Sequence, residues 1–264
     1  MARVTAVSLR ERKSKGEKIA VLTAYDYPCA KLLDETGIDV VLVGDSVANA
    51  VMGRNDTLSV TVDEMLHHVA MVSAAVEKAL VVADMPFLSY QVCPEDAVRN
   101  AGRLIAEGGA QAVKLEGPAD KFGAAIEAIL RAGIPVMGHI GLTPQSVHQL
   151  GGYKVQGRSP EAQMRLKKEA AGLEDAGCFA VVLECMPAAL AAEISTALSI
   201  PTIGIGAGAA CDGQVLVLHD MLGWGSTRFT KTFGDVRALM CQACGDYIEA
   251  VKSGAFPGKE HEYS

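Results

Sequence analysis

Charged and hydroxyl side chains stand at the ends of several short apolar segments of this chain. The segment DVVLV, for example, is followed at once by Gly44, Asp45 and Ser46. The other segments end in a similar way, at the following residues: Asp26, Asp84, Lys114 with Glu116, His139, Glu184, and His219 with Asp220. If they were brought together, four acids such as Asp45, Asp84, Glu116 and Glu184 would repel one another unless a cation or a lysine lay among them.

A set of carboxylate oxygens suits a hard cation, and Mg²⁺ best of all, with water and substrate oxygens completing the coordination. The chain has no histidine-rich or thiolate set of the kind that binds zinc. Lys114 stands two residues before Glu116, so in a strand both side chains point to the same face. The pattern therefore predicts a magnesium site with one lysine beside it.

Each of these residues also has a simpler interpretation. Asp26 and Asp220 could be the N-caps of the helices that follow them, and His139 could be a hydrogen-bonded histidine of the core. The glycines of GIGAG (204–208) could bind a phosphate through backbone N–H groups, or they could relieve crowding.

Eight apolar segments alternate with amphipathic segments along the chain. We expect strands in these segments: 18–26, 39–46, 80–87, 110–117, 134–141, 178–185, 200–208 and 213–220. Continuous apolar strands followed by helices are typical of a parallel sheet covered by helices. Eight such units in 264 residues predict an α/β protein with a closed (β/α)8 (TIM) barrel. The alternative, an open doubly wound sheet, often carries G-x-G-x-x-G after its first strand, and this chain has none there.

In a (β/α)8 barrel the carboxyl ends of all strands lie at one face, where active sites are found. We therefore expect the residues at the strand ends to converge there. No linker or low-complexity segment interrupts the chain, so we expect a single domain over residues 1–264 with a helical N-terminal arm.

Composition excludes several other classes of protein. The net charge is −7, and no basic cluster of the kind that binds nucleic acid is present. No apolar segment is long enough to span a membrane, and the basic N-terminus lacks the apolar core of a secretory signal. The seven cysteines are scattered rather than arranged as a disulfide framework. We expect a cytoplasmic protein.

Several long blocks of the sequence, together covering nearly the whole chain, resemble the ketopantoate hydroxymethyltransferase family. They are TAYDYPCAKLLDETGIDVVLVGDS, TVDEM, ADMPF, VKLEG, GHIGLTPQSVHQLGGYKVQGR, LECMP, IPTIGIGAG and DGQVLVLHDMLG. The resemblance implies a phosphoenolpyruvate/pyruvate-domain-like barrel, assembled as a homodecamer of two stacked rings of five. It also implies Mg²⁺-dependent transfer of a one-carbon unit from 5,10-methylenetetrahydrofolate to 3-methyl-2-oxobutanoate, which gives 2-dehydropantoate in pantothenate biosynthesis.

The resemblance also implies roles for individual residues. The family's metal carboxylates correspond to Asp45, Asp84 and Glu116, and its proposed catalytic base corresponds to Glu184. Its substrate contacts correspond to these residues: Asp45, Ser46, Asp84 and Lys114, with His139 lining the same pocket. The chain departs from the family pattern after Ser46, in residues 55–61, and in the segment after the eighth strand.

Two other functions fit parts of this pattern. One is a Mg²⁺-dependent lyase or mutase of the related barrels that bind enolpyruvate-like substrates, and a test of folate dependence would separate it from the transferase. The other is a barrel without catalytic activity that is retained only for assembly. Loss of a metal-binding carboxylate or of the catalytic base would indicate such a protein, and this chain has kept both.

Overall fold

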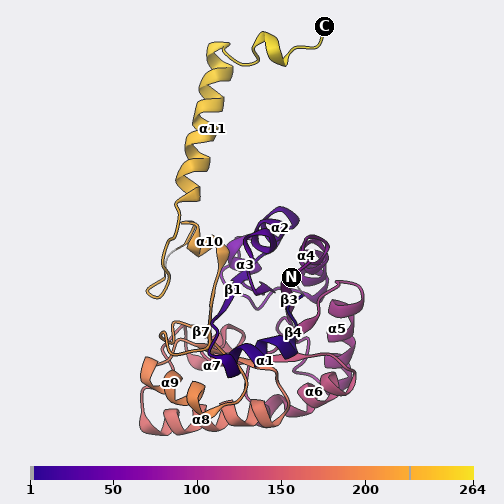
Figure 1. The fold of residues 1–264 in the computed structure, drawn as a ribbon, viewed down its shortest axis with the longest axis vertical. Helices are drawn as coiled ribbons and strands as arrows, with labels where there is room; N and C mark the ends of the chain where they lie inside the picture. Colours follow the sequence, from indigo (N-terminus) through magenta and orange to yellow (C-terminus); the bar gives the residue numbers. More distant parts are fainter. Residues whose placement is uncertain (1–2, 226) are drawn as a thin grey trace. The chain divides into compact units, whose positions relative to one another are not determined.

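Eight parallel strands close into a barrel in chain order, from β1 to β8 and back to β1 (Figure 1). The structure is a computed structural model that describes residues 3–225 and 227–264. The strands are β1 (Ile19–Thr23), β2 (Val40–Val43), β3 (Leu80–Asp84), β4 (Ala112–Lys114), β5 (Val136–Gly141), β6 (Ala180–Glu184), β7 (Thr202–Ile205) and β8 (Gly213–Leu216). The predicted closed (β/α)8 barrel is confirmed.

Helices follow the strands and cover the outside of the barrel (Figure 1). They are α2 (Tyr27–Thr36), α3 (Val47–Ala50), α4 (Val62–Ala75), α5 (Pro94–Ala106), α6 (Ala119–Arg131), η1 (Pro144–Ser146), α7 (Val147–Leu150), α8 (Pro160–Asp175) and α9 (Ala188–Ala197). Capping residues explain where some of these helices begin. Thr61 and Glu64 form a reciprocal capping box at the start of α4, and Pro94 occupies the first turn of α5.

The N-terminal arm is the helix α1 (Ala6–Lys15), which packs against the core. Leu9 of this helix is fully buried, in one cluster with barrel residues such as Ile19, Ile203 and Val215. Lys13 adds an ion pair, its Nζ lying 2.9 Å from Asp212 Oδ2 just before β8. The first helix is therefore part of the barrel unit.

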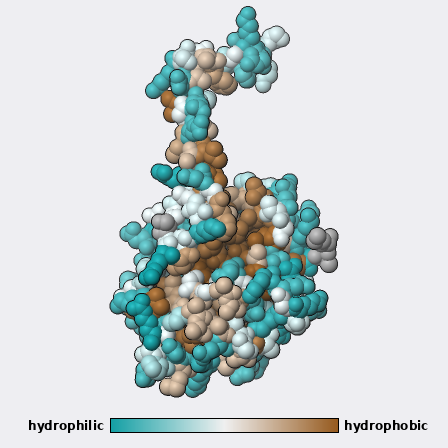
Figure 2. All heavy atoms as spheres, turned by 60° about the vertical axis from the view of Figure 1, so that its left-hand side comes forward, coloured by the Kyte–Doolittle hydropathy of each residue, from teal (hydrophilic) through white to brown (hydrophobic). Residues whose placement is uncertain are grey.

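The chain forms two compact units, residues 1–217 and residues 218–264. The second unit holds α10 (Leu218–Met221), α11 (Val236–Ser253) and η2 (Lys259–His261). No described residue of α11 is buried, and its apolar side chains are visible in Figure 2. The exposed large apolar residues of this helix are Leu239, Met240, Tyr247, Ile248 and Val251. The prediction of a single domain over residues 1–264 remains a prediction.

Among the helices of residues 3–225 and 227–264, none is both long enough and apolar enough to cross a bilayer.

Asp34, on the last turn of α2, is a buried acid that serves the fold rather than the barrel mouth. Its carboxylate accepts hydrogen bonds from the backbone N–H groups of Glu77 (3.1 Å), Lys78 (3.0 Å) and Ala79 (2.8 Å), just before β3. Burial alone would raise the pKa of Asp34, but these N–H groups and the charge of Lys78 together lower it. The ionised carboxylate therefore fixes the segment that leads into β3.

We predict that Asp34→Ala lowers the free energy of unfolding by about 2 kcal/mol at pH 7, because buried N–H groups lose their acceptor. Since folding lowers the pKa of Asp34, its contribution is present above about pH 4 and is lost as pH falls through the lowered value. Urea unfolding from pH 7 to pH 3 measures both effects. The variant should lose less stability on acidification than the parent does.

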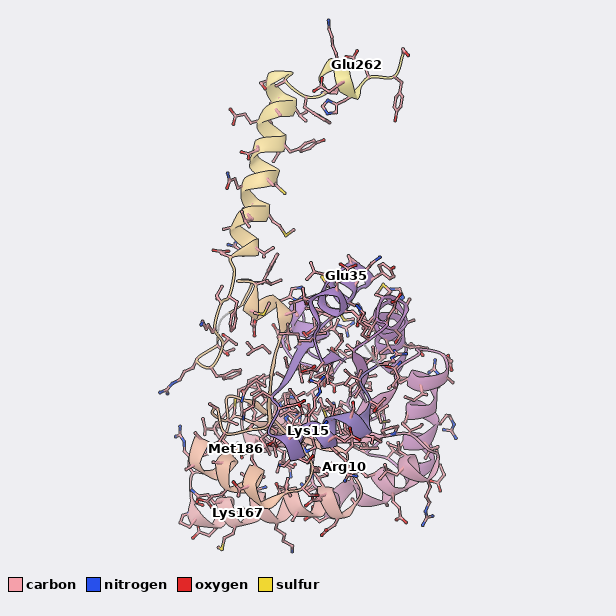
Figure 3. The ribbon with its side chains drawn as sticks, viewed as in Figure 1. Arg10, Lys15, Glu35, Lys167, Met186 and Glu262 are labelled. Atoms are coloured by element: carbon pink, nitrogen blue, oxygen red, sulfur yellow. The ribbon has the colours of Figure 1, made fainter. Side chains whose placement is uncertain are left out.

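The matched control is Glu35→Ala, at the next position on α2, where the side chain is exposed (Figure 3). Equal stabilities of the two variants at pH 7 would contradict the role assigned to Asp34.

Candidate functional site

Several charged side chains point into the barrel because side chains alternate between the two faces of a strand. Alternate residues of a strand share a face, so Asp84 points the same way as the core residue Val82, and His139 the same way as Met137. Lys114 and Glu116 continue in this way from Ala112, and Glu184 continues from Val182. Each of these four strands, β3 to β6, is apolar where it lines the core and charged where it reaches its carboxyl end. The predicted convergence follows from this geometry.

Lys114 lies among the carboxylates. The register pairs Lys114 with Asp84 on the neighbouring strand, and Lys114 Nζ lies 2.8 Å from Asp84 Oδ1 and 3.8 Å from Glu116 Oε1. All three side chains are at most 5% exposed. Burial alone would lower the pKa of Lys114, but the charges of Asp84, Glu116 and Asp45 raise it above its usual range. The ammonium group is therefore charged.

Asp45 joins the cluster through the turn after β2. Its backbone N–H donates a hydrogen bond to Asp84 Oδ2 (3.1 Å), and its side chain is buried. Burial, followed by repulsion from Glu116 and Asp84, raises the pKa of Asp45 to about 8. The absence of a side chain at Gly44 leaves room for this turn, because a Cβ there would lie 2.7 Å from Ser46 Oγ and would displace that hydroxyl.

His139 connects two of the acids. Its Nδ1 lies 3.4 Å from Glu116 Oε1, and its Nε2 lies 3.1 Å from Glu184 Oε2. Burial and the charge of Lys114 would lower the pKa of His139, but the two carboxylates outweigh them and raise it to about 9. The ring therefore carries a positive charge near neutral pH and holds Glu184 against the cluster.

Ser46 lies at the edge of this group, and Tyr25 contacts it. The Ser46 and Tyr25 hydroxyl oxygens are 2.8 Å apart, and the Tyr25 ring is buried. The site thus combines carboxylates, one ammonium, one imidazolium and a hydroxyl at the carboxyl end of a barrel.

Comparison with known proteins places the chain in a family. The family model for ketopantoate hydroxymethyltransferase matches residues 3–259. The 3-methyl-2-oxobutanoate hydroxymethyltransferase of Geobacter sulfurreducens is 55% identical, with 98% of each chain covered. The enzyme of the same name from Syntrophotalea carbinolica is 54% identical, with 99% of each chain covered. The chain belongs to the ketopantoate hydroxymethyltransferase family.

Solved structures of other barrels share the fold of this family member. A 2,3-dimethylmalate lyase, described as a member of the PEP mutase/isocitrate lyase superfamily, has a TM-score of 0.61 at 19% identity, covering 98% of this chain and 91% of the other. A phosphonopyruvate hydrolase in complex with oxalate and Mg²⁺ has a TM-score of 0.64 at 12% identity, covering 97% and 93%. The predicted barrel fold is confirmed, and it is similar to the fold of these phosphonopyruvate and dimethylmalate enzymes.

The charge of the ketopantoate hydroxymethyltransferase site fits a divalent cation. Four carboxyl groups face one ammonium and one imidazolium, which leaves an excess of negative charge when all are ionised. The donors are hard oxygen atoms, which Mg²⁺ prefers, and Mg²⁺ commonly takes only one or two carboxylates and fills its other positions with water and substrate. Among the described residues, no three acidic, histidine or cysteine side chains are arranged to hold an ion by themselves, so water and substrate oxygens would have to complete its coordination.

Several strand-end residues do not join the cluster. The prediction that the eighth strand continues to Asp220 is wrong: β8 ends at Leu216, and His219 and Asp220 belong to α10. Asp26 is an N-cap, accepting a hydrogen bond from the Cys29 N–H at 2.8 Å. For the GIGAG glycines the structure favours the crowding interpretation, because a Cβ at Gly208 would lie 2.5 Å from that of Ala188.

Three polar residues of this site were missed by reasoning from the strand ends. Tyr25, Tyr90 and Gln145 are buried and hydrogen-bonded to the cluster or to its backbone. All three are uncharged, and Tyr90 and Gln145 lie several residues beyond a strand. The only available signal was that Tyr25 and Gln145 fall within the blocks that resemble the family.

We predict that Lys114→Met lowers the free energy of unfolding by about 3 kcal/mol at pH 7 without added metal, because it leaves buried carboxylates unpaired. Urea denaturation measures the change. Lys121→Met, at an exposed position on α6, is the matched control and should change stability by less than about 0.5 kcal/mol. If the two variants unfold at the same urea concentration, the central role of Lys114 is wrong.

Proposed function

We propose that this protein is a 3-methyl-2-oxobutanoate hydroxymethyltransferase of pantothenate biosynthesis. The observation that carries the proposal is its family membership, with 55% of the residues identical to a relative over 98% of each chain. The one-carbon donor is 5,10-methylenetetrahydrofolate, and the product is 2-dehydropantoate. The buried cluster of acids and a lysine at the barrel mouth supports this chemistry.

The residues at the mouth suit a 2-oxo acid. Lys114 pairs with the substrate carboxylate, and the Ser46 hydroxyl, set in place by Tyr25, donates a hydrogen bond to it. Asp45, Asp84 and Glu116 would hold Mg²⁺. When bound there, the ion supplies a Lewis acid for the negative charge that develops on the keto oxygen.

Glu184 is proposed as the base that removes the proton from C3 of the substrate. The electron pair of the C3–H bond then forms the enolate, and C3 bonds to the one-carbon unit that the folate supplies. Water provides the oxygen of the new hydroxymethyl group, and the C–N bonds between the one-carbon unit and the folate break, which leaves tetrahydrofolate. His139, 3.1 Å from Glu184, holds the carboxylate in place. Because the His139 pKa is raised to about 9, the ring lies beside Glu184 as a cation near neutral pH.

We also propose that the protein assembles as a homodecamer in the cytoplasm. The apolar side chains of α11, which are exposed in this single chain, support an assembly of several copies. The free cysteines of the described residues fit a reducing compartment. Light scattering coupled to size-exclusion chromatography tests the assembly, and a monomeric mass would overturn that part of the proposal.

We predict that the protein exchanges the C3 proton of 3-methyl-2-oxobutanoate for deuterium in D₂O with Mg²⁺, and that Glu184→Gln slows this exchange by at least about a hundredfold. Proton NMR of the substrate follows the reaction without folate. Glu193→Gln, an exposed glutamate on α9, is the control and should exchange at the parent rate.

If Glu184→Gln exchanged normally, the base would have to be another residue. If the parent showed no exchange with Mg²⁺, alone or with tetrahydrofolate added, the proposed reaction itself would be contradicted.

A separate prediction concerns the metal. Asp84→Ala should weaken Mg²⁺ binding by at least about tenfold, because it removes a buried carboxylate from the proposed ligand set. Glu184→Gln should bind Mg²⁺ nearly as well as the parent. Isothermal titration calorimetry separates the two variants, and unchanged affinity in Asp84→Ala would rule that residue out as a ligand.

A further inference from the structure

The side chain of Gln145 is buried in the loop after β5 and is fully hydrogen-bonded. Its Nε2 donates to Asp45 Oδ2 (2.9 Å) and to the carbonyl of Met85 (3.0 Å). Its Oε1 lies 2.8 Å from the Tyr90 hydroxyl and accepts from Gln91 Nε2 (3.0 Å). Both amide protons are therefore used. Oε1 accepts from Gln91 and shares the single Tyr90 hydroxyl proton with the Glu116 carbonyl oxygen, which lies 2.9 Å from that hydroxyl.

This network permits only one orientation of the amide. If the group were turned over, its carbonyl oxygen would face the carboxylate of Asp45 and the carbonyl of Met85, and its NH₂ would face the NH₂ of Gln91. Buried polar groups without partners cost about 1–3 kcal/mol each, so the turned-over state is not populated. Gln145 thus always presents a donor to Asp45.

Gln145 also contacts a second acid of the cluster. Its backbone N–H donates to Glu116 Oε2 at 2.9 Å. The Tyr90 hydroxyl, which adjoins the Gln145 side chain, accepts from the Glu116 N–H at 3.1 Å. One residue therefore contacts carboxylates that follow two different strands, β2 and β4, which β3 separates in the barrel.

The chemistry of an amide matters in this position. A lysine or arginine would neutralise Asp45, as Lys114 does for Asp84. A neutral amide donates a hydrogen bond to one oxygen and fixes the plane of the carboxylate without cancelling its charge. Partners of this kind orient carboxylates that bind metals, and their loss typically costs 10–100-fold in metal affinity or activity.

We propose that Gln145 is a positioning residue, which holds Asp45 and Glu116 in the arrangement that binds the divalent cation and so sets the affinity of the site for it. The inference rests on the proposed function, because it assigns Gln145 to the metal that the reaction uses. It acts through Asp45 and Glu116 and does not itself take part in the chemistry.

The test is calorimetric titration of the purified full-length protein with MgCl₂, at a temperature well below unfolding. Gln145→Met keeps the volume of the side chain and removes its hydrogen bonds. We expect its Kd for Mg²⁺ to rise 10–100-fold. The rate of deuterium exchange into 3-methyl-2-oxobutanoate should recover toward the parent value as MgCl₂ is raised, because the base is untouched.

The control is Gln149→Met, the same substitution at an exposed position of α7, which should leave the Kd unchanged. If Gln145→Met does not fold, Tyr90→Phe removes one of the two donors to Gln145 Oε1 and should weaken Mg²⁺ binding in the same direction by a smaller factor.

The outcomes distinguish this inference from the proposed function. A purely structural role would lower the unfolding temperature while the folded variant bound Mg²⁺ as the parent does, and that result would overturn the inference alone. If the Gln145 and Gln149 variants bound equally tightly, it would also be overturned. If the parent itself bound no Mg²⁺, both the inference and the metal dependence of the proposed reaction would be wrong.

Discussion

The ammonium group of Lys114 lies against Asp84 and near Glu116 where water is largely excluded, and the other acids of the site depend on this cation. Two like charges 4 Å apart repel by about 4 kcal/mol at an effective dielectric constant of about 20. Several such repulsions would together equal the free energy of unfolding of a typical domain, which is about 5–15 kcal/mol. Lys114, and then His139, reduce this repulsion to a level that the fold tolerates.

In the barrel, the same strands form the apolar core and hold the charged groups at the mouth. Val82, Met137 and Val182 fill the interior, and the residues two positions later carry charge at the mouth. The apolar part of each strand is covered by helices and by its neighbours, so the charged end is held rigidly. The positions of the acids are therefore determined by the packing below them rather than by flexible loops.

Much of the fold and of the charged cluster could be predicted from the sequence. The alternation of apolar strands and amphipathic helices indicated the barrel, and the rule that strand ends meet brought Asp84, Lys114 and Glu184 together. The end of β8 was predicted wrongly, because VLHD has the composition of a strand continuing to Asp220, whereas the chain forms α10 from Leu218.

Neutral partners could not be found in the same way. Gln145 lies in the short helix η1 after β5, and its side chain reaches Asp45, which is 100 positions away in the sequence. No local pattern encodes which donor will meet which carboxylate across a barrel, because that depends on the register of strands and on the course of the loops between them. Charge and periodicity predicted which charged residues lie together at the barrel mouth. Only the structure showed which neutral side chains orient them.

The packing of α1 has a consequence for how the protein is made. Leu9 and Lys13 precede every strand of the barrel in the chain. Yet Lys13 pairs with Asp212, and Leu9 belongs to the same core cluster as Ile203 and Val215, near the end of the barrel. While the ribosome is still translating the first six strands, the helix lacks the surfaces that bury Leu9 and pair with Lys13. The helix α1 therefore completes its docking only after β7 and β8 have emerged, so an element that precedes the barrel and the barrel's last strands enter the fold together.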